Sequence, residues 1–82
     1  MIEVLYFAWM RERVGVPRER LETRAATVAD LIAELAAKEE RYAWAFADLT
    51  SVRVALDQEL SSFDAPLARV REVAFFPPMT GG

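Results

Sequence analysis

The last eight residues of the 82-residue chain are the most promising place for chemistry: Phe75-Phe76-Pro77-Pro78-Met79-Thr80-Gly81-Gly82. Two successive prolines lack backbone N–H donors and hold φ fixed, so a strand ending at Phe76 is expected to leave its sheet as a stiff, extended segment. The two glycines have no Cβ, which keeps the backbone thin and the last carbonyl open to attack. We therefore predict that the chain acts through the terminal carboxylate of Gly82.

The expected tail, residues 77–82, has the right length to enter a cleft in another protein. Six extended residues reach at most about 20 Å, at ~3.3 Å each. A carboxylate is a poor acyl donor, so its use requires activation, for example as a mixed anhydride with AMP. The chain has no glycine-rich phosphate loop, so a separate enzyme must supply that step. The competing interpretation is an inert terminus with a chance pair of glycines.

Composition excludes several other classes of function. The chain has no cysteine and no histidine, which removes disulfides, thiolate nucleophiles and zinc sites, and we expect no bound metal. Net charge is −3 and the arginines alternate with acids, as in Arg11-Glu12-Arg13, so nucleic acid is an unfavourable partner. Uncharged runs are too short to cross a bilayer and no secretory signal is present, so a cytoplasmic location is expected.

Hydrophobic periodicity and turn residues divide the chain into short elements. The segment 41–47 fits a helix or a strand, and we favour a short helix. Thr27 is expected to cap the main helix, in which Val28, Leu31, Ile32 and Leu35 share one face. The complete expectation is a strand at 2–9, one helical turn at 10–14 stopped by Gly15, a polar edge strand at 20–23, the main helix, strands at 52–56 and 59–60 joined by Asp57-Gln58, and a strand at 73–76.

This order predicts an α+β fold with a mixed sheet of about five strands and one main helix packed on one face. The first and last strands are apolar on both faces, so they are expected to pair at the sheet centre. That is the ubiquitin-like β-grasp arrangement in outline. It divides the chain into a β-grasp domain at 1–76 and the tail at 77–82.

A carrier that docks through its tail also needs an apolar surface beside it. The candidates for this interface are Phe7, Leu60 and Phe75, together with Arg11 for pairing with a partner's carboxylate. Burial in the core is the alternative for any single apolar residue among them. Trp9 and Trp44 are interpreted as core residues, and the acids Asp57, Glu59, Asp64 and Glu72 as solvated surface.

The chain resembles the MoaD family, the small subunits of molybdopterin synthase. The resemblance covers essentially the whole chain, and its most specific part is the ending Phe-Phe-Pro-Pro-x-Thr-Gly-Gly. The other matching segments are Val4-Leu5-Tyr6-Phe7-Ala8, Arg11-Glu12 before Val14-Gly15, Thr27-Val28 and Glu72-Val73-Ala74. Two turns depart from the usual pattern of the family: Ala55-Leu56-Asp57-Gln58 and Ala68-Arg69-Val70-Arg71.

The resemblance implies a sulfur carrier with no bound cofactor, whose Gly82 is adenylated by an enzyme related to the ubiquitin-activating enzymes. A sulfur-donor protein then allows conversion of the AMP adduct to a thiocarboxylate. The tail (Pro77, Pro78, Met79, Thr80, Gly81 and Gly82) enters the large synthase subunit and delivers sulfur to cyclic pyranopterin monophosphate. The assembly is a heterotetramer, and the large subunit carries the catalytic side chains.

Two related functions remain as alternatives. The sulfur carrier of thiamine thiazole synthesis also ends in diglycine, although it lacks the Phe-Phe-Pro-Pro approach. A ubiquitin-like modifier would be joined to other proteins through Gly82, and Lys38 is the one lysine of this chain. Lysine-linked adducts in cells would favour the modifier.

Overall fold

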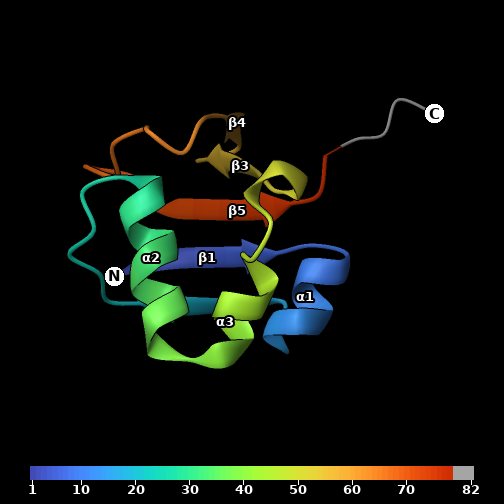
Figure 1. The fold of residues 1–82 in the computed structure, drawn as a ribbon. Helices are drawn as coiled ribbons and strands as arrows, with labels where there is room; N and C mark the ends of the chain where they lie inside the picture. Colours follow the sequence, from blue (N-terminus) through green and yellow to red (C-terminus); the bar gives the residue numbers. More distant parts are fainter. Residues whose placement is uncertain (79–82) are drawn as a thin grey trace.

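The computed structural model describes residues 1–78, which form one five-stranded sheet with helices against it (Figure 1). The strands lie in the spatial order β2-β1-β5-β3-β4. The mixed α+β sheet is therefore confirmed, and the second strand is at an edge as predicted. Strand bounds are Ile2–Tyr6 (β1), Arg18–Leu21 (β2), Arg53–Leu56 (β3), Glu59–Leu60 (β4) and Glu72–Phe76 (β5).

The first and last strands are neighbours within the sheet. β1 and β5 pair in parallel, with Val4 opposite Val73 and Tyr6 opposite Phe75. β5 also pairs antiparallel with β3, so that it is hydrogen-bonded on both sides. Because β1 and β5 run in the same direction, both finish at the end of the sheet where β3 begins (Figure 1). We call this the exit end, because the chain leaves the sheet there after Phe76.

The helices supply the second layer of the fold. They are α1 (Trp9–Val14), α2 (Val28–Lys38), α3 (Glu40–Ala45) and the 3₁₀ helix η1 (Leu49–Ser51). α2 and α3 lie in front of the sheet in Figure 1. The Asp30 N–H donates to the Thr27 hydroxyl over 3.2 Å, which confirms the predicted cap. The four apolar residues predicted for one face of α2 are all buried: Val28, Leu31, Ile32 and Leu35.

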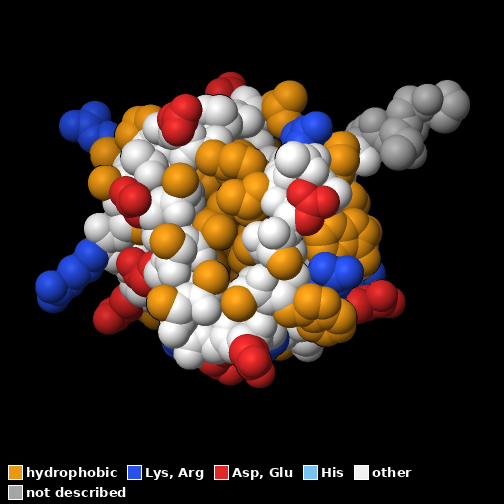
Figure 2. Space-filling view, in the orientation of Figure 1, with side chains coloured by type: hydrophobic (Ala, Val, Ile, Leu, Met, Phe, Trp, Pro, Cys, Tyr) orange, Lys and Arg blue, Asp and Glu red, His pale blue; other side chains and the backbone are white. Residues whose placement is uncertain are grey.

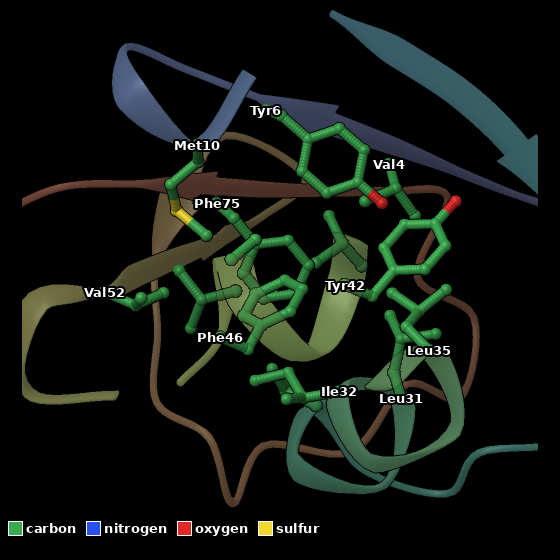
Figure 3. Packing of buried hydrophobic residues seen from close by; sticks show 14 of the residues in the cluster. Val4, Tyr6, Met10, Leu31, Ile32, Leu35, Tyr42, Phe46, Val52 and Phe75 are labelled. Carbon is green, nitrogen blue, oxygen red and sulfur yellow. The ribbon is translucent and has the colours of Figure 1, made fainter. Parts of the chain in front are cut away.

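Three aromatic rings fill the core at the exit end (Figure 3). The Phe75 ring stacks on Tyr6 with a centroid separation of 6.2 Å, and Phe46 meets Phe75 edge-on at 4.8 Å. Phe75 is completely buried. Offset and edge-on contacts of this kind stabilise a core beyond their buried area. They hold the end of β5 between β1 and Phe46, the residue that follows α3.

The turn between β3 and β4 places two non-glycine residues in the left-handed region. Asp57 and Gln58 have φ values of 49° and 70° and connect β3 to β4, as a two-residue hairpin turn requires. One Asp57 carboxylate oxygen accepts the N–H groups of Arg71 and Glu72 at 3.1 and 3.0 Å. This aspartate therefore joins the hairpin to the start of β5.

The first two strands differ from their predicted bounds. β1 ends at Tyr6 and Trp9 begins α1, because Ala8 turns the chain with φ 53° and ψ −132°. Apolar alternation continues through this turn, so it misleadingly indicated a longer strand. β2 begins at Arg18, earlier than predicted, because its pairing with β1 continues to Leu5 and the Arg18 guanidinium contacts Glu3 at 2.8 Å.

The sequence predicted the helices more reliably than the strand bounds. Gly15 ends α1 in the left-handed conformation at φ 95°, and its N–H donates to the Arg11 carbonyl over 2.8 Å. Only glycine adopts this conformation without steric cost, which is why the sequence signal was clear. The segment that fitted either a helix or a strand is helical, as α3.

We predict that Arg69→Gly raises the free energy of unfolding by about 0.5–1 kcal/mol, because Arg69 has φ 67° and its Cβ is crowded there. Urea unfolding followed by circular dichroism measures this change. Arg71→Gly is the matched control: Arg71 is equally exposed but lacks the positive φ, so it should lose stability through added chain entropy. Equal shifts of the same sign in both variants would contradict this explanation.

Candidate functional site

The tail begins directly after the best-packed part of β5. The last strand residue is Phe76, followed by Pro77 and Pro78, which are partly exposed. The Phe7 N–H donates to the Phe75 carbonyl over 3.1 Å. The two prolines have no N–H to extend this ladder. The remaining tail residues predicted to enter a partner, Met79, Thr80, Gly81 and Gly82, lie outside the described residues.

An apolar row crosses the sheet on the side away from its buried residues. Strand register places Leu5 beside Ala74, Ala74 beside Ala55, and Ala55 beside Leu60. The neighbours of these residues along each strand, such as Val4, Val54 and Val73, point into the core. Leu60 is 75% exposed, whereas the other three are partly buried. We call Leu5, Phe7, Ala55, Leu60, Ala74 and Phe76 the open face.

Three of the four predicted interface residues are accessible. Phe7 is 44% exposed, and Arg11 also lies on the surface, on α1. Leu60, on β4, is 75% exposed. The fourth prediction, Phe75, is wrong, because its ring points to the helix side and is buried against Phe46. Alternation along β5 makes Phe76 the partly exposed member of the pair.

The prediction that Trp44 belongs to the core is also wrong, since 59% of its surface is exposed. α3 turns Tyr42, Ala45 and Phe46 inward, and helical spacing then directs position 44 to solvent. Once residues 41–47 are taken as a helix, their helical periodicity already predicts that position 44 faces solvent. Trp9 is partly buried against the core, close to its prediction. Leu49 on η1, 38% exposed, was missed.

Trp44 forms part of an ordered stack on the helix side. The guanidinium carbon of Arg13 lies 4.7 Å from the ring centroid of Trp9 and 4.7 Å from that of Trp44. Arg13 also donates to the Trp44 backbone carbonyl over 3.2 Å. Cation–π attraction therefore joins α1 to α3 at the surface. Figure 2 shows hydrophobic side chains with an adjacent basic group over α1 and α3.

Beneath the site, both tyrosines of the chain share one carboxylate oxygen. The hydroxyls of Tyr6 and Tyr42 donate to Glu19 Oε2 over 2.8 and 2.6 Å. Figure 3 shows the two rings side by side with their oxygens toward the same region. Arg41 donates to the Tyr42 oxygen and to the Val14 carbonyl. Burial, helped by the hydrogen bond to Glu19, raises the pKa of both tyrosines above their ordinary value.

This cluster links the elements that carry the exposed residues. Tyr6 is the last residue of β1, Glu19 belongs to β2 and Tyr42 to α3. Hydrogen bonds to a charged acceptor are stronger than those between neutral groups. They hold β1 and α3 in fixed positions immediately behind Phe7 and Trp44.

The described residues offer no metal centre. No group of three or more histidine, cysteine, aspartate or glutamate residues among residues 1–78 is arranged to hold a metal ion. None of the helices in that same part of the chain is long and apolar enough to span a membrane. The candidate site is the surface around the exit end, where the exposed side chains of Phe7, Arg11 and Trp44 lie.

Comparison with known proteins assigns the chain to a family. Residues 4–82 match the ThiS family. The chain belongs to the ThiS family. It is 45% identical to the molybdopterin synthase sulfur carrier subunit of Escherichia coli K12 and 38% identical to that of Haemophilus influenzae Rd. Both alignments cover 82 residues and the full length of each protein. The recognition of the MoaD family from its closing motif is confirmed.

A solved structure confirms the fold of this ThiS-family chain. The small archaeal modifier protein 1 of Haloferax volcanii superposes with a TM-score of 0.76 at 25% sequence identity. The superposition covers 95% of this chain and 97% of that one. The ubiquitin-like β-grasp prediction is thereby confirmed. The same likeness links the fold to a modifier as well as to carriers.

We predict that neither tyrosine ionises at its ordinary pKa of about 10 while the chain is folded. The unfolded chain releases these protons near pH 10 and the folded chain retains them, so the free energy of unfolding falls as pH rises above about 10. Tyrosinate absorbance, measured beside circular dichroism, should rise only together with unfolding. A tyrosinate transition near pH 10 in folded protein would contradict the buried cluster.

Proposed function

We propose that this chain is the sulfur carrier subunit of molybdopterin synthase, acting through a thiocarboxylate at Gly82. The observation that carries the proposal is the match over the whole chain, and over the whole of each relative, to two proteins with that name. The arrangement at the exit end supports it. A carrier has to present its terminus away from its own body, and here two prolines follow a strand whose penultimate residue is fully buried.

Activation and loading proceed in two steps, both performed by partners. The Gly82 carboxylate oxygen attacks the α-phosphate of ATP on a ubiquitin-activating-like adenylyltransferase, and pyrophosphate leaves. Sulfide (HS⁻), supplied by way of a sulfur-donor protein, then attacks the carbonyl of the acyl adenylate and displaces AMP. The product is a thiocarboxylate on the last residue of the chain. A chain without cysteine has no thiol of its own to compete for the activated carbonyl.

Delivery requires a second partner, the large subunit of molybdopterin synthase. The open face fits a stable contact with that subunit, because its residues are apolar and small alanines lie at its centre. Stable interfaces between subunits are more apolar than transient ones. Tail and open face together bring the sulfur to cyclic pyranopterin monophosphate in a heterotetramer located in the cytoplasm. Catalytic side chains belong to the large subunit, so this chain is a substrate-like component.

The thiocarboxylate is tested by intact mass spectrometry. After incubation with ATP, the adenylyltransferase and a sulfur source, the mass should rise by the difference between one sulfur and one oxygen atom. Deletion of Gly82 should abolish the increase while leaving the circular dichroism spectrum unchanged. An unchanged mass with an enzyme that loads another carrier, or adducts joined to lysines of other proteins, would instead favour a protein modifier.

We predict that Leu60→Asp weakens binding to the large subunit by about 30-fold or more, because a charge replaces an exposed apolar anchor. The side chain is 75% exposed, so folding should be unaffected. Ala29→Asp is the matched control, placing the same charge on an exposed position in the first turn of α2. Isothermal titration measures both affinities. Equal affinities for the two variants would exclude the open face as the contact.

A further inference from the structure

β3 contains a single charged residue, Arg53, and its register places it beside the start of the tail. Arg53 is opposite Phe76, the last residue of β5, in the antiparallel pair. Side chains of directly opposite residues lie on the same face of a sheet. Arg53 is exposed, and it therefore adds a positive charge to the open face at the point where the chain leaves the sheet.

Hydrogen bonds hold the Arg53 side chain close to the backbone of η1. Its Nη1 donates to the Thr50 carbonyl over 3.2 Å and to the Val52 carbonyl over 3.1 Å. Both acceptors come shortly before Arg53 in the chain, so these contacts restrict where the guanidinium can lie. A side chain that is already ordered loses less conformational entropy when a partner binds it.

The Arg53 guanidinium also retains donors for a partner. The ion pairs found among residues 1–78 join Arg18 to Glu3 and Arg41 to Glu39, and no carboxylate of that segment lies within ion-pair distance of Arg53. Hydrogen bonds within the described part of the chain use its Nη1 alone. Nε and Nη2 together form a fork that fits both oxygens of one carboxylate.

A protein that takes up the tail has to cover Arg53. Pro77 follows directly after Phe76, the residue opposite Arg53, so a cleft that receives the chain from Pro77 onward begins beside this guanidinium. A charge that is covered by an apolar or basic surface loses water without gaining a partner, which weakens binding. A carboxylate at the mouth of the cleft offsets that loss.

We propose that Arg53 is a specificity-determining residue of the open face, pairing with a carboxylate of the large subunit beside the cleft that receives the tail. This inference rests on the proposed function, because it takes that subunit as the partner. The apolar residues of the open face fit many apolar surfaces. Arg53 restricts docking to a surface with an acid at this position, since an unpaired charge disfavours other partners.

Isothermal titration of the large subunit with variants of Arg53 tests the pairing. Arg53→Gln should weaken binding about tenfold, because charge-assisted hydrogen bonds are lost. Arg53→Lys keeps the charge without the fork, so we expect an intermediate affinity. Arg20→Gln is the matched control and should bind like the wild-type chain. Arg20 is an exposed arginine on the same side of the sheet, opposite Glu3 and near the start of β1, away from the exit end.

Salt dependence separates pairing from a structural role of Arg53. Affinity of the wild-type chain should fall as salt increases, and Arg53→Gln should flatten this dependence. Loss of the bonds to the Thr50 and Val52 carbonyls would by itself lower the unfolding temperature and leave the salt dependence unchanged. Thermal unfolding of every variant therefore accompanies the titrations and checks that the fold is retained.

Weaker binding and a flatter salt dependence for Arg53→Gln, with neither change for Arg20→Gln, supports the assignment. Equal affinities of Arg53→Gln and the wild-type chain overturn it and leave Arg53 a local contact of η1. Equal losses in Arg53→Gln and Arg20→Gln also overturn it, because net charge would then explain both. Weaker binding of Arg53→Gln with an unchanged salt dependence overturns it as well. A wild-type chain that does not bind the large subunit would instead refute the proposed function.

Discussion

The parallel pairing of β1 with β5 is the constraint on which the rest of the structure depends. It places the ends of both strands at one end of the sheet, with Tyr6 opposite Phe75. Since β3 pairs on the other side of β5, the last strand is held along both edges. The tail therefore leaves from a fixed point, and the segment after β1 begins beside it. Had β5 not paired with β1, the exit would lie apart from Phe7 and α1.

Alternation along these strands directs one set of side chains into the core and the other set to the open face. Tyr6 and Phe75 point to the helices and are buried, whereas Leu5 and Ala74 point to the other side. A hydrogen-bonded carboxylate beneath Tyr6 and Tyr42 ties β1, β2 and α3 together. The buried side thus fixes the point at which the chain leaves the sheet after Phe76, and the surface around that point is left free for partners. A domain with few reactive side chains is sufficient for this task, because it only has to fix the point from which the tail leaves the sheet.

Much of the fold could be predicted because its signals are local. The Thr27 cap, the apolar spacing of α2, the left-handed Gly15 and the Asp57-Gln58 turn each depend on a few adjacent residues. The end of β1 could not be predicted, because Ala8 adopts a conformation that usually signals glycine. The site was recognised from its final motif. Which aromatic residues are exposed depends on register and helix rotation, so Phe75 and Trp44 were assigned to the wrong environments.

The central claim is that Gly82, the last residue of the tail, carries the sulfur. The most direct test is a single turnover in which a semisynthetic chain with a thiocarboxylate at Gly82 is mixed with the large subunit and cyclic pyranopterin monophosphate. The account predicts that each chain gives up one sulfur atom to the pterin and returns to the carboxylate form, without ATP or the adenylyltransferase. A chain that binds the large subunit but keeps its sulfur would contradict it.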